Sequence, residues 1–198
     1  MKYGIIMTVH NNPKQLKRLC ETLVNDSAYF FIHVDKKSDI NIFKEELKDI
    51  PRLKLISTTK VYWADISQVD ATIDLLKEAV KANMDYIFFI SGQDYLIKSD
   101  NNLLNYVDIN KNYMEYYKLP NKNWGEDGRC NRYLYYHNIV NANGIKKFNP
   151  RDRYYKFINR ALLKIQKALH IKRKFIKNYI PYSGANWFYI NKECATYI

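Results

Sequence analysis

Three apolar runs in this sequence each adjoin a cluster of polar or small residues that could bind a ligand. The clusters are Asp35-Lys36-Lys37 after Phe31–Val34, Ser91-Gly92-Gln93-Asp94 after Tyr86–Ile90, and Ser183-Gly184 in Tyr182–Phe188. Each apolar run is typical of a buried strand, and ligands of open α/β sheets bind at the carboxyl ends of the strands. The pattern therefore indicates one binding site built on several strands.

Asp35 is the most informative carboxylate of these clusters. No Asp-x-Asp pair follows a predicted strand, and Asp35 stands beside Lys36 and Lys37. Divalent ions need several oxygen ligands, so a lone carboxylate beside two ammonium groups is a poor metal site, and we expect none. The carboxylate could instead accept hydrogen bonds from a sugar or a base while the lysines face phosphate. A helix cap or an ion pair with Lys36 is the structural alternative.

Several catalytic and nucleotide-binding fingerprints are absent from the sequence. No Gly-x-Gly-x-x-Gly run follows the first apolar segment, and neither a Gly-x-x-x-x-Gly-Lys-Ser/Thr loop nor a Gly-x-Ser-x-Gly elbow occurs. These runs mark dinucleotide binding, P-loop phosphate binding and α/β-hydrolase chemistry. The sequence therefore indicates none of these three functions.

Apolar periodicity predicts the elements that position the clusters. Short apolar runs predict strands, and apolar residues three and four positions apart predict helices. The predicted helix over 67–82 has Val69, Ile73, Leu76 and Val80 as its apolar stripe. In chain order we predict a strand at Tyr3–Val9, a helix at Lys14–Leu23, a strand at Tyr29–Val34, a helix at Phe43–Leu47, a strand at Leu53–Ile56, a helix at Ser67–Ala82, a strand at Tyr86–Ile90 and a strand at Trp187–Ile190.

This alternation of strands and helices predicts an α/β fold with a mostly parallel sheet flanked by helices. A chain of 198 residues with 47% hydrophobic and 15% aromatic residues can bury one sizeable core. We therefore expect a single domain over residues 1–198.

Positive charge is concentrated in one stretch of the chain. The net charge is +12, and residues 141–180 hold twelve lysines and arginines against one acidic residue, Asp152. Within this stretch, apolar spacing predicts an amphipathic basic helix at Tyr154–His170. Such a charge run is usually a solvated helix face, but its density also suits an anionic partner: a phospholipid, a phosphorylated glycan carrier or a nucleic acid.

Cysteine usage and hydropathy indicate the compartment. Cys20, Cys130 and Cys194 form an odd set without metal-ligand spacing, which predicts free thiols in a reducing environment. The first residues are too short an apolar run for a signal peptide, and no segment approaches about 18 consecutive apolar residues. We expect a cytoplasmic protein whose membrane contact, if any, is peripheral.

Five motifs together resemble the core-2/I-branching enzyme family, glycosyltransferase family 14. They occur in the family's order across nearly the whole chain, so the combination is more specific than any single run. The resemblance implies a GT-A-like fold and an inverting, metal-independent transfer of N-acetylglucosamine or xylose from a UDP-sugar to an acceptor hydroxyl, with no cofactor. The motifs are Val9-His10, Phe31–Lys37, Tyr62–Ser67, Ile90–Lys98 and Tyr182–Phe188.

The resemblance also implies roles for individual residues. Structural alternatives stay open: a loop cap for His10, a turn for Asp94, a packed loop for the region from Glu115 to Arg132, and either core or site for Trp187. Val9, His10, Asp35, Tyr62, Trp63, Ser183 and Gly184 should surround the UDP-sugar, and Asp94, Glu115, Trp124, Arg129 and Arg132 should contact a glycan or lipid-linked glycan acceptor.

The catalytic base is not assigned to any residue of this sequence. In the family it is a glutamate of an Asp-Glu pair well after the Ser-Gly strand, with the diphosphate-binding Arg and Lys later still. This chain stops at Ile198, before both, and Glu193 does not match the base. We therefore expect a fold that is incomplete at its C-terminus, with residues 1–100 as the nucleotide-binding half and 101–198 as the acceptor-side half. The chain would be a truncated form, or a pseudo-enzyme or fragment.

The resemblance and the lack of a secretory signal suggest surface-glycan synthesis at the inner face of a bacterial membrane. Two non-catalytic alternatives remain: a basic nucleic-acid-binding module and a peripheral membrane protein that uses residues 154–170. No RNA-binding signature accompanies the charge, and Asp35, Asp94 and Glu115 would repel phosphate. We therefore expect no nucleic-acid partner.

Overall fold

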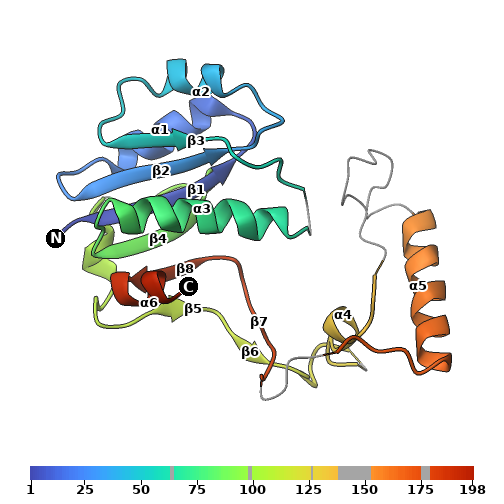
Figure 1. Cartoon of the computed structure of the whole chain (residues 1–198). Coiled ribbons are helices and arrows are strands. Elements are labelled where there is room, and N and C mark those ends of the chain that lie inside the picture. The colour runs from blue at the N-terminus through green and yellow to red at the C-terminus, as the bar shows by residue number, and fades with distance from the viewer. Residues whose placement is uncertain (63–64, 98–99, 126, 138–152, 175–178) are drawn as a thin grey trace. The chain divides into compact units, whose positions relative to one another are not determined.

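The computed structural model describes residues 1–62, 65–97, 100–125, 127–137, 153–174 and 179–198. The chain forms two compact units (Figure 1). Unit 1 comprises residues 1–114 and 185–198, and unit 2 comprises residues 115–184. The expected division into halves at residue 100 stays a prediction.

A six-stranded mixed sheet forms the centre of unit 1. Its strand order is β3-β2-β1-β4-β8-β5. The first four strands in the chain are parallel, whereas β8 runs antiparallel to both β4 and β5. The predicted α/β class, a mostly parallel sheet flanked by helices, is confirmed, and it agrees with the GT-A-like fold that the family resemblance implies. The strands are β1 (Tyr3–Val9), β2 (Ala28–Val34), β3 (Leu53–Ile56), β4 (Tyr86–Ser91), β5 (Tyr113–Met114) and β8 (Phe188–Asn191).

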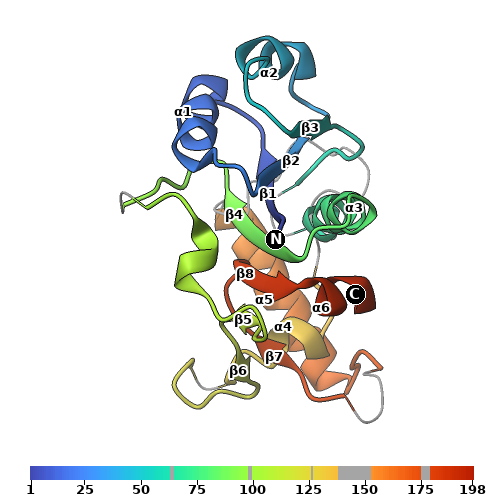
Figure 2. The ribbon, with the colours of Figure 1, turned by 90° about the vertical axis from the view of Figure 1, so that its left-hand side faces the viewer.

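Helices cover both faces of this sheet (Figure 2). Helices α1 and α2 pack on one face, and α3 and α6 pack on the other. Pro13 is the first residue of α1, where its missing N–H costs nothing, and the Asp39 carboxylate caps α2 by accepting the Asn41 N–H at 2.9 Å. The elements are α1 (Pro13–Leu23), α2 (Ile40–Glu46), α3 (Ser67–Lys81), α6 (Lys192–Tyr197) and the 3₁₀ helix η1 (Leu103–Tyr106).

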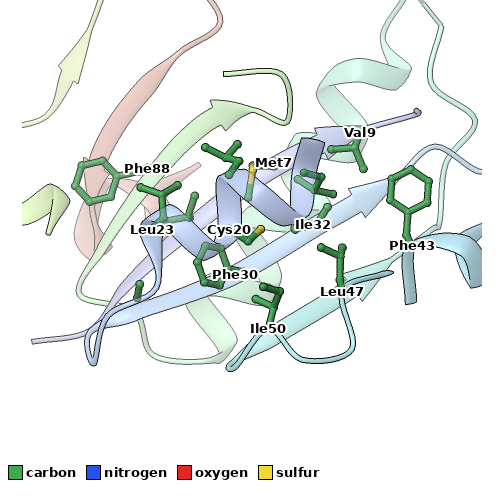
Figure 3. Close-up of a cluster of buried hydrophobic side chains, with 14 of the residues drawn as sticks. Met7, Val9, Cys20, Leu23, Phe30, Ile32, Phe43, Leu47, Ile50 and Phe88 are labelled. Atoms are coloured by element: carbon green, nitrogen blue, oxygen red, sulfur yellow. The ribbon is translucent and has the colours of Figure 1, made fainter. Parts of the chain in front are cut away.

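Alternate residues of the strands enter two separate apolar cores. On β1, Tyr3, Ile5, Met7 and Val9 face α1 and α2, and Ile6 faces α3. Figure 3 shows the first of these cores, in which side chains of β1, β2, α1 and α2 pack together. Because both faces are covered, the parallel strands read as nearly continuous apolar runs, which is why the sequence located them.

The apolar stripe predicted for α3 is wrong in part. Val69 is 49% exposed, whereas Ala71, Leu75 and Ala79 are buried together with Leu76. Alanine side chains allow the helix axis to approach the sheet closely, and the larger Val69 lies outside that contact. Periodicity of large apolar residues alone did not identify the buried face.

Unit 2 contains a short two-stranded sheet and the predicted basic helix. Strands β6 (Tyr117–Lys118) and β7 (Tyr182–Ser183) are antiparallel. The other described elements are α4 (Asn131–Leu134) and α5 (Arg153–Ala168), and α5 confirms the helix predicted at 154–170. Gln166 of α5 is 4% exposed and clamps the helix to Tyr136, donating to its carbonyl and accepting its N–H, each at 2.8 Å.

Candidate functional site

The carboxyl ends of β1, β2 and β4 meet where the strand order of unit 1 reverses. From β1 the chain continues through α1 to β2 on one side, and β4 joins β1 on the other side. Such a switch point is where open α/β sheets bind ligands.

Two cavities open at this position, and the end of β1 lines both of them. The cavity on the β2 side has a volume of ≈ 330 Å³ and is lined by Thr8, Val9, His10, Asp35, Lys37, Val61 and Gln68. The cavity on the β4 side has a volume of ≈ 210 Å³ and is lined by Thr8, Val9, His10, Asn11, Ser91, Gly92 and Gln93. The structure thus brings Val9, His10 and Asp35 together.

The Asp35 carboxylate is held in place by three contacts from two residues, Lys37 and Val61. Its Oδ1 accepts the N–H of Lys37 at 2.9 Å and of Val61 at 3.3 Å, and its Oδ2 lies 3.2 Å from Lys37 Nζ. Its backbone N–H donates to the Val9 carbonyl at 2.8 Å, which ties the end of β2 to the end of β1. The expected ion pair with Lys36 is therefore made by Lys37, and Asp35 does not cap α2, since Asp39 does.

Lys37 links Asp35 to the loop that precedes α3. Its ammonium donates to the Val61 carbonyl and lies 4.3 Å from the centroid of the Tyr62 ring, a cation–π distance. Tyr62 thereby adjoins the larger cavity, although it is not among the residues that line it. Trp63, predicted beside it, lies outside the described residues.

His33 is a buried polar residue near this site, and nothing in the sequence indicated its structural role. It is fully buried, and its Nε2 accepts the N–H of Thr59 at 3.2 Å, so the ring proton is on Nδ1. Nδ1 has no partner in the described part of the chain. Burial lowers the pKa of His33, while the carboxylates of Asp74 and Asp35 oppose that shift. A neutral His33 therefore orients the loop that carries Val61.

His10 is exposed at the rim of both cavities. Its carbonyl accepts the Ser38 hydroxyl at 2.6 Å, which fixes the chain, and His10 is among the residues that line the two cavities. The loop-cap and site roles expected for its side chain stay predictions.

Asp94 forms a turn and also binds a tryptophan. Its Oδ2 accepts the Ser91 N–H at 2.8 Å and the Trp187 indole Nε1–H at 3.0 Å. Trp187 is 48% exposed, so it is not a core residue. The turn role that we considered for Asp94 is therefore real, yet Oδ1 accepts no hydrogen bond from the described residues. That oxygen can therefore accept a hydrogen bond from a ligand.

Three of the expected acceptor residues lie together in unit 2. The Tyr117 hydroxyl donates to Glu115 Oε1 at 2.8 Å, the Tyr117 and Trp124 ring centroids are 4.9 Å apart, and the Arg129 guanidinium lies 4.1 Å from the Trp124 ring centroid. Tyr117 joins this cluster without having been predicted. The Arg132 side chain is exposed, and only its backbone N–H reaches Arg129.

Ser183 and Gly184 also belong to unit 2. Ser183 pairs with Tyr117 across the two strands, and a Cβ on Gly184 would lie 1.7 Å from the Glu115 carbonyl oxygen. The close approach that a small residue permits here is therefore to the backbone of Glu115. The expected donor and acceptor sets are each divided between the two units, and their assignments stay predictions.

Among the described residues, the cysteines form no disulfide and the metal-ligating side chains form no cluster. All three cysteines are free, as predicted, and burial raises the pKa of Cys20 to about 12, which keeps it a thiol. Over the described ranges, no three His, Cys, Asp or Glu side chains are placed to hold a metal ion. No helix in that part of the chain is both long and apolar enough to cross a membrane.

Comparison with known proteins gives one family and one curated relative. A family model described as Core-2/I-Branching enzyme matches residues 5–198. A xylosyltransferase of Ciona intestinalis is 29% identical over 119 residues, which cover 56% of this chain and 14% of that protein. The chain therefore spans a small part of the length of that relative.

Two solved structures match this chain at low sequence identity. A cytidylyltransferase from Leptospira borgpetersenii serovar Hardjo-bovis matches with a TM-score of 0.40 and 15% identity, over 59% of this chain and 52% of that one. The 4-diphosphocytidyl-2C-methyl-D-erythritolsynthase from Anaerococcus prevotii matches with a TM-score of 0.47 and 12% identity, over 98% and 71% of the two chains. Both TM-scores are too low to carry a conclusion about this chain.

Proposed function

Because this chain belongs to the Core-2/I-branching enzyme family, we propose that it binds a UDP-sugar at the carboxyl ends of β1 and β2 and transfers the sugar to an acceptor hydroxyl. The sugar is N-acetylglucosamine or xylose, and the acceptor is a glycan or lipid-linked glycan of a bacterial surface. The transfer inverts the anomeric carbon and needs no metal ion. The acceptor oxygen forms a bond to that carbon as the bond to UDP breaks, and a carboxylate takes the hydroxyl proton.

The cavity that contains Asp35 is the observation that carries this proposal. Asp35 is 5% exposed and its Oδ1 already accepts two backbone N–H groups, so Oδ2, beside Lys37, is the oxygen left for a ligand. A carboxylate oxygen accepts only, so it fits the N3–H of uracil and not the unprotonated N3 of cytosine. The site should therefore prefer UDP to CDP.

Calorimetric titration of the chain with UDP, UDP-N-acetylglucosamine and CDP, with and without chelator, tests the proposal. In Asp35→Asn, the two N–H donors keep the amide oxygen at the Oδ1 position and leave the NH₂ toward the ligand. We expect UDP to bind at least about tenfold more weakly and the preference over CDP to vanish. Asp39→Asn makes the same charge change at an exposed residue and preserves the cap of α2, so it should bind UDP normally.

The proposed UDP-sugar site is refuted if neither UDP nor UDP-N-acetylglucosamine binds, or if Asp35→Asn and Asp39→Asn bind UDP with the same affinity. Binding that disappears with chelator would refute the metal-independent part of the proposal alone.

We also propose that α5 is the peripheral membrane contact of this protein, with anionic lipid as its partner. Phe157 and Ile165 of α5 are 70% and 55% exposed, and Leu169, the residue that follows the helix, is 64% exposed. The three recur at multiples of four residues and form an apolar ridge. Single exposed apolar residues are common on protein surfaces, but exposed apolar residues that recur on one side of a helix beside basic residues are typical of a helix at a membrane surface. A helix with such a ridge can lie with its apolar side in the headgroup region of a bilayer.

Exposed basic residues run beside this apolar ridge. Arg160, Lys164 and Lys167 are spaced by four and three residues, and α5 has no acidic residue. An apolar ridge flanked by cations matches an anionic membrane surface in both hydrophobicity and charge.

Co-sedimentation with phosphatidylserine/phosphatidylcholine vesicles tests this contact. Lys164→Glu/Lys167→Glu should release the protein from the vesicles, and Lys77→Glu/Lys81→Glu, with the same change of charge on α3, should not. Equal sedimentation of the two double variants would refute the role of α5. If Lys164→Glu/Lys167→Glu lost binding to DNA but still sedimented with the vesicles, a nucleic acid would be favoured as the partner of α5.

A further inference from the structure

An apolar cavity of ≈ 390 Å³ lies in unit 1 next to Asp94. Its walls come from α1, β4, η1, β5, β8 and the segment after β4, and they include Leu19, Phe88, Leu103 and Val107. Asp94 is the one charged side chain among the described residues that line it. A cavity with such walls is poorly hydrated and favours an apolar ligand.

Consecutive residues at the end of β4 and just after it line both this apolar cavity and the smaller cavity at the strand ends. Ser91, the last residue of β4, lines the ≈ 210 Å³ cavity beside β1 together with Gly92 and Gln93, and the following residues, Asp94 to Ile97, line the apolar cavity. A molecule bound at Asp94 can therefore place one end toward the predicted sugar-nucleotide site and the other in the apolar cavity.

The polar end of such a molecule has a place to bind at the cavity mouth. Asp94 Oδ2 is engaged by Ser91 and Trp187, and the other carboxylate oxygen is available to a sugar hydroxyl. Trp187, 48% exposed and hydrogen-bonded to that carboxylate, offers an aromatic face for a sugar ring.

The rim of the cavity carries apolar side chains whose exposure to water is unfavourable. Tyr95 is 51% exposed and Ile97 is 96% exposed, and both line the cavity. An apolar chain that enters the cavity would cover part of this surface and gain the corresponding hydrophobic free energy.

We propose that this cavity binds the apolar aglycone of the acceptor, so that the acceptor is an amphiphilic glycoside whose sugar lies at Asp94 and Trp187 and whose hydrocarbon or aromatic part fills the cavity. The inference rests on the proposed transferase function and names the substrate class of that reaction. A soluble oligosaccharide without an apolar aglycone would leave the cavity empty.

Octyl β-glucoside below its micelle concentration and methyl β-glucoside are the probes, titrated calorimetrically into the chain with and without saturating UDP. We expect the octyl glycoside to bind at least about tenfold more tightly than the methyl glycoside, since the chain buries additional methylene groups. Its binding should persist in the presence of UDP, because donor and acceptor must occupy the protein together.

Filling the cavity should remove this preference. Val107→Phe places a larger side chain in the lining, and Val80→Phe makes the same change at a partly buried valine on the opposite face of the sheet. We expect Val107→Phe to lose the octyl preference with UDP binding retained, which also shows that it folds, and Val80→Phe to keep both.

Equal affinities for the two glycosides, or an octyl preference that survives Val107→Phe, would overturn the proposal. Mutual exclusion of UDP and octyl glucoside would overturn the acceptor role as well. Octyl binding in a protein that does not bind UDP would remove the transferase premise, and the acceptor assignment with it, while the cavity remained an apolar binding site.

Discussion

Replacement of Gly92 by alanine should destabilise unit 1 through a single steric contact. A Cβ on Gly92 would lie 2.2 Å from Cγ1 of Val9, and its next neighbours, Val9 Cβ and Leu16 Cδ1, would be at 3.5 Å. The Gly92 backbone is not among the positive-φ glycines, so the cost arises from contact and not from conformation. Gly92 is buried directly after β4, where its lack of a side chain leaves room for Val9 at the end of β1.

The magnitude follows from how far the two carbons must move apart. Non-bonded carbons sit about 3.5–4.0 Å apart, so Val9 must yield by more than about 1 Å. Val9 is β-branched with a stiff χ1 and is 7% exposed, so it cannot rotate away freely. Overpacking of this kind costs about 1–3 kcal/mol. The melting temperature should fall by about 2–4 °C for each kcal/mol in a chain of this size.

A double-mutant cycle with Val9→Ala isolates the contact. Val9→Ala removes Cγ1, so Gly92→Ala in that background should cost almost nothing, and the two changes together should cost less than their sum by at least about 1 kcal/mol. Urea unfolding monitored by circular dichroism gives the four free energies. A neutral Gly92→Ala, or strictly additive costs, would refute the steric reasoning.

Three further predictions concern groups that are buried or strained. Burial holds the pKa of His33 below its unfolded value near 6.5, so the stability that a neutral His33 contributes should be full above about pH 6.5 and decline as the pH falls. In His33→Gln, the midpoint of urea unfolding should therefore depend less on pH between about pH 7 and 5. An unchanged pH dependence of the midpoint would contradict this. Gln166→Ala leaves the N–H and carbonyl of Tyr136 unpaired and should cost about 1–3 kcal/mol, seen as faster hydrogen exchange in α5; unaltered exchange would show that the clamp is dispensable. Gly128 has φ +53° and its Cβ would meet Pro120 Cβ at 2.7 Å, so Gly128→Ala should lower thermal stability by more than about 1 kcal/mol, and an unchanged melting temperature would argue against this strain.

Local patterns in the sequence determined most elements of unit 1 and the position of Asp35 at the end of a strand. Strand and helix periods are set by neighbours a few residues apart, so β1 to β4, α1 and α3 were predicted within one residue of their bounds. Helix α2 was predicted to start at Phe43, whereas it starts at Ile40. The run at Asp35 indicated a carboxylate at a strand end for the same reason. The free thiols of the three cysteines also followed from their number and spacing.

Contacts between distant residues were decided only by the tertiary structure. The bond from Trp187 to Asp94 joins residues 93 positions apart, and the support of Asp35 by Val61 spans 26 positions. The antiparallel direction of β8, the alanine face of α3 and the apolar cavity beside Asp94 likewise depend on which elements the chain brings together. A sequence period indicates an apolar face of an element, but which residues are buried, and against which partner, is set by the path of the whole chain.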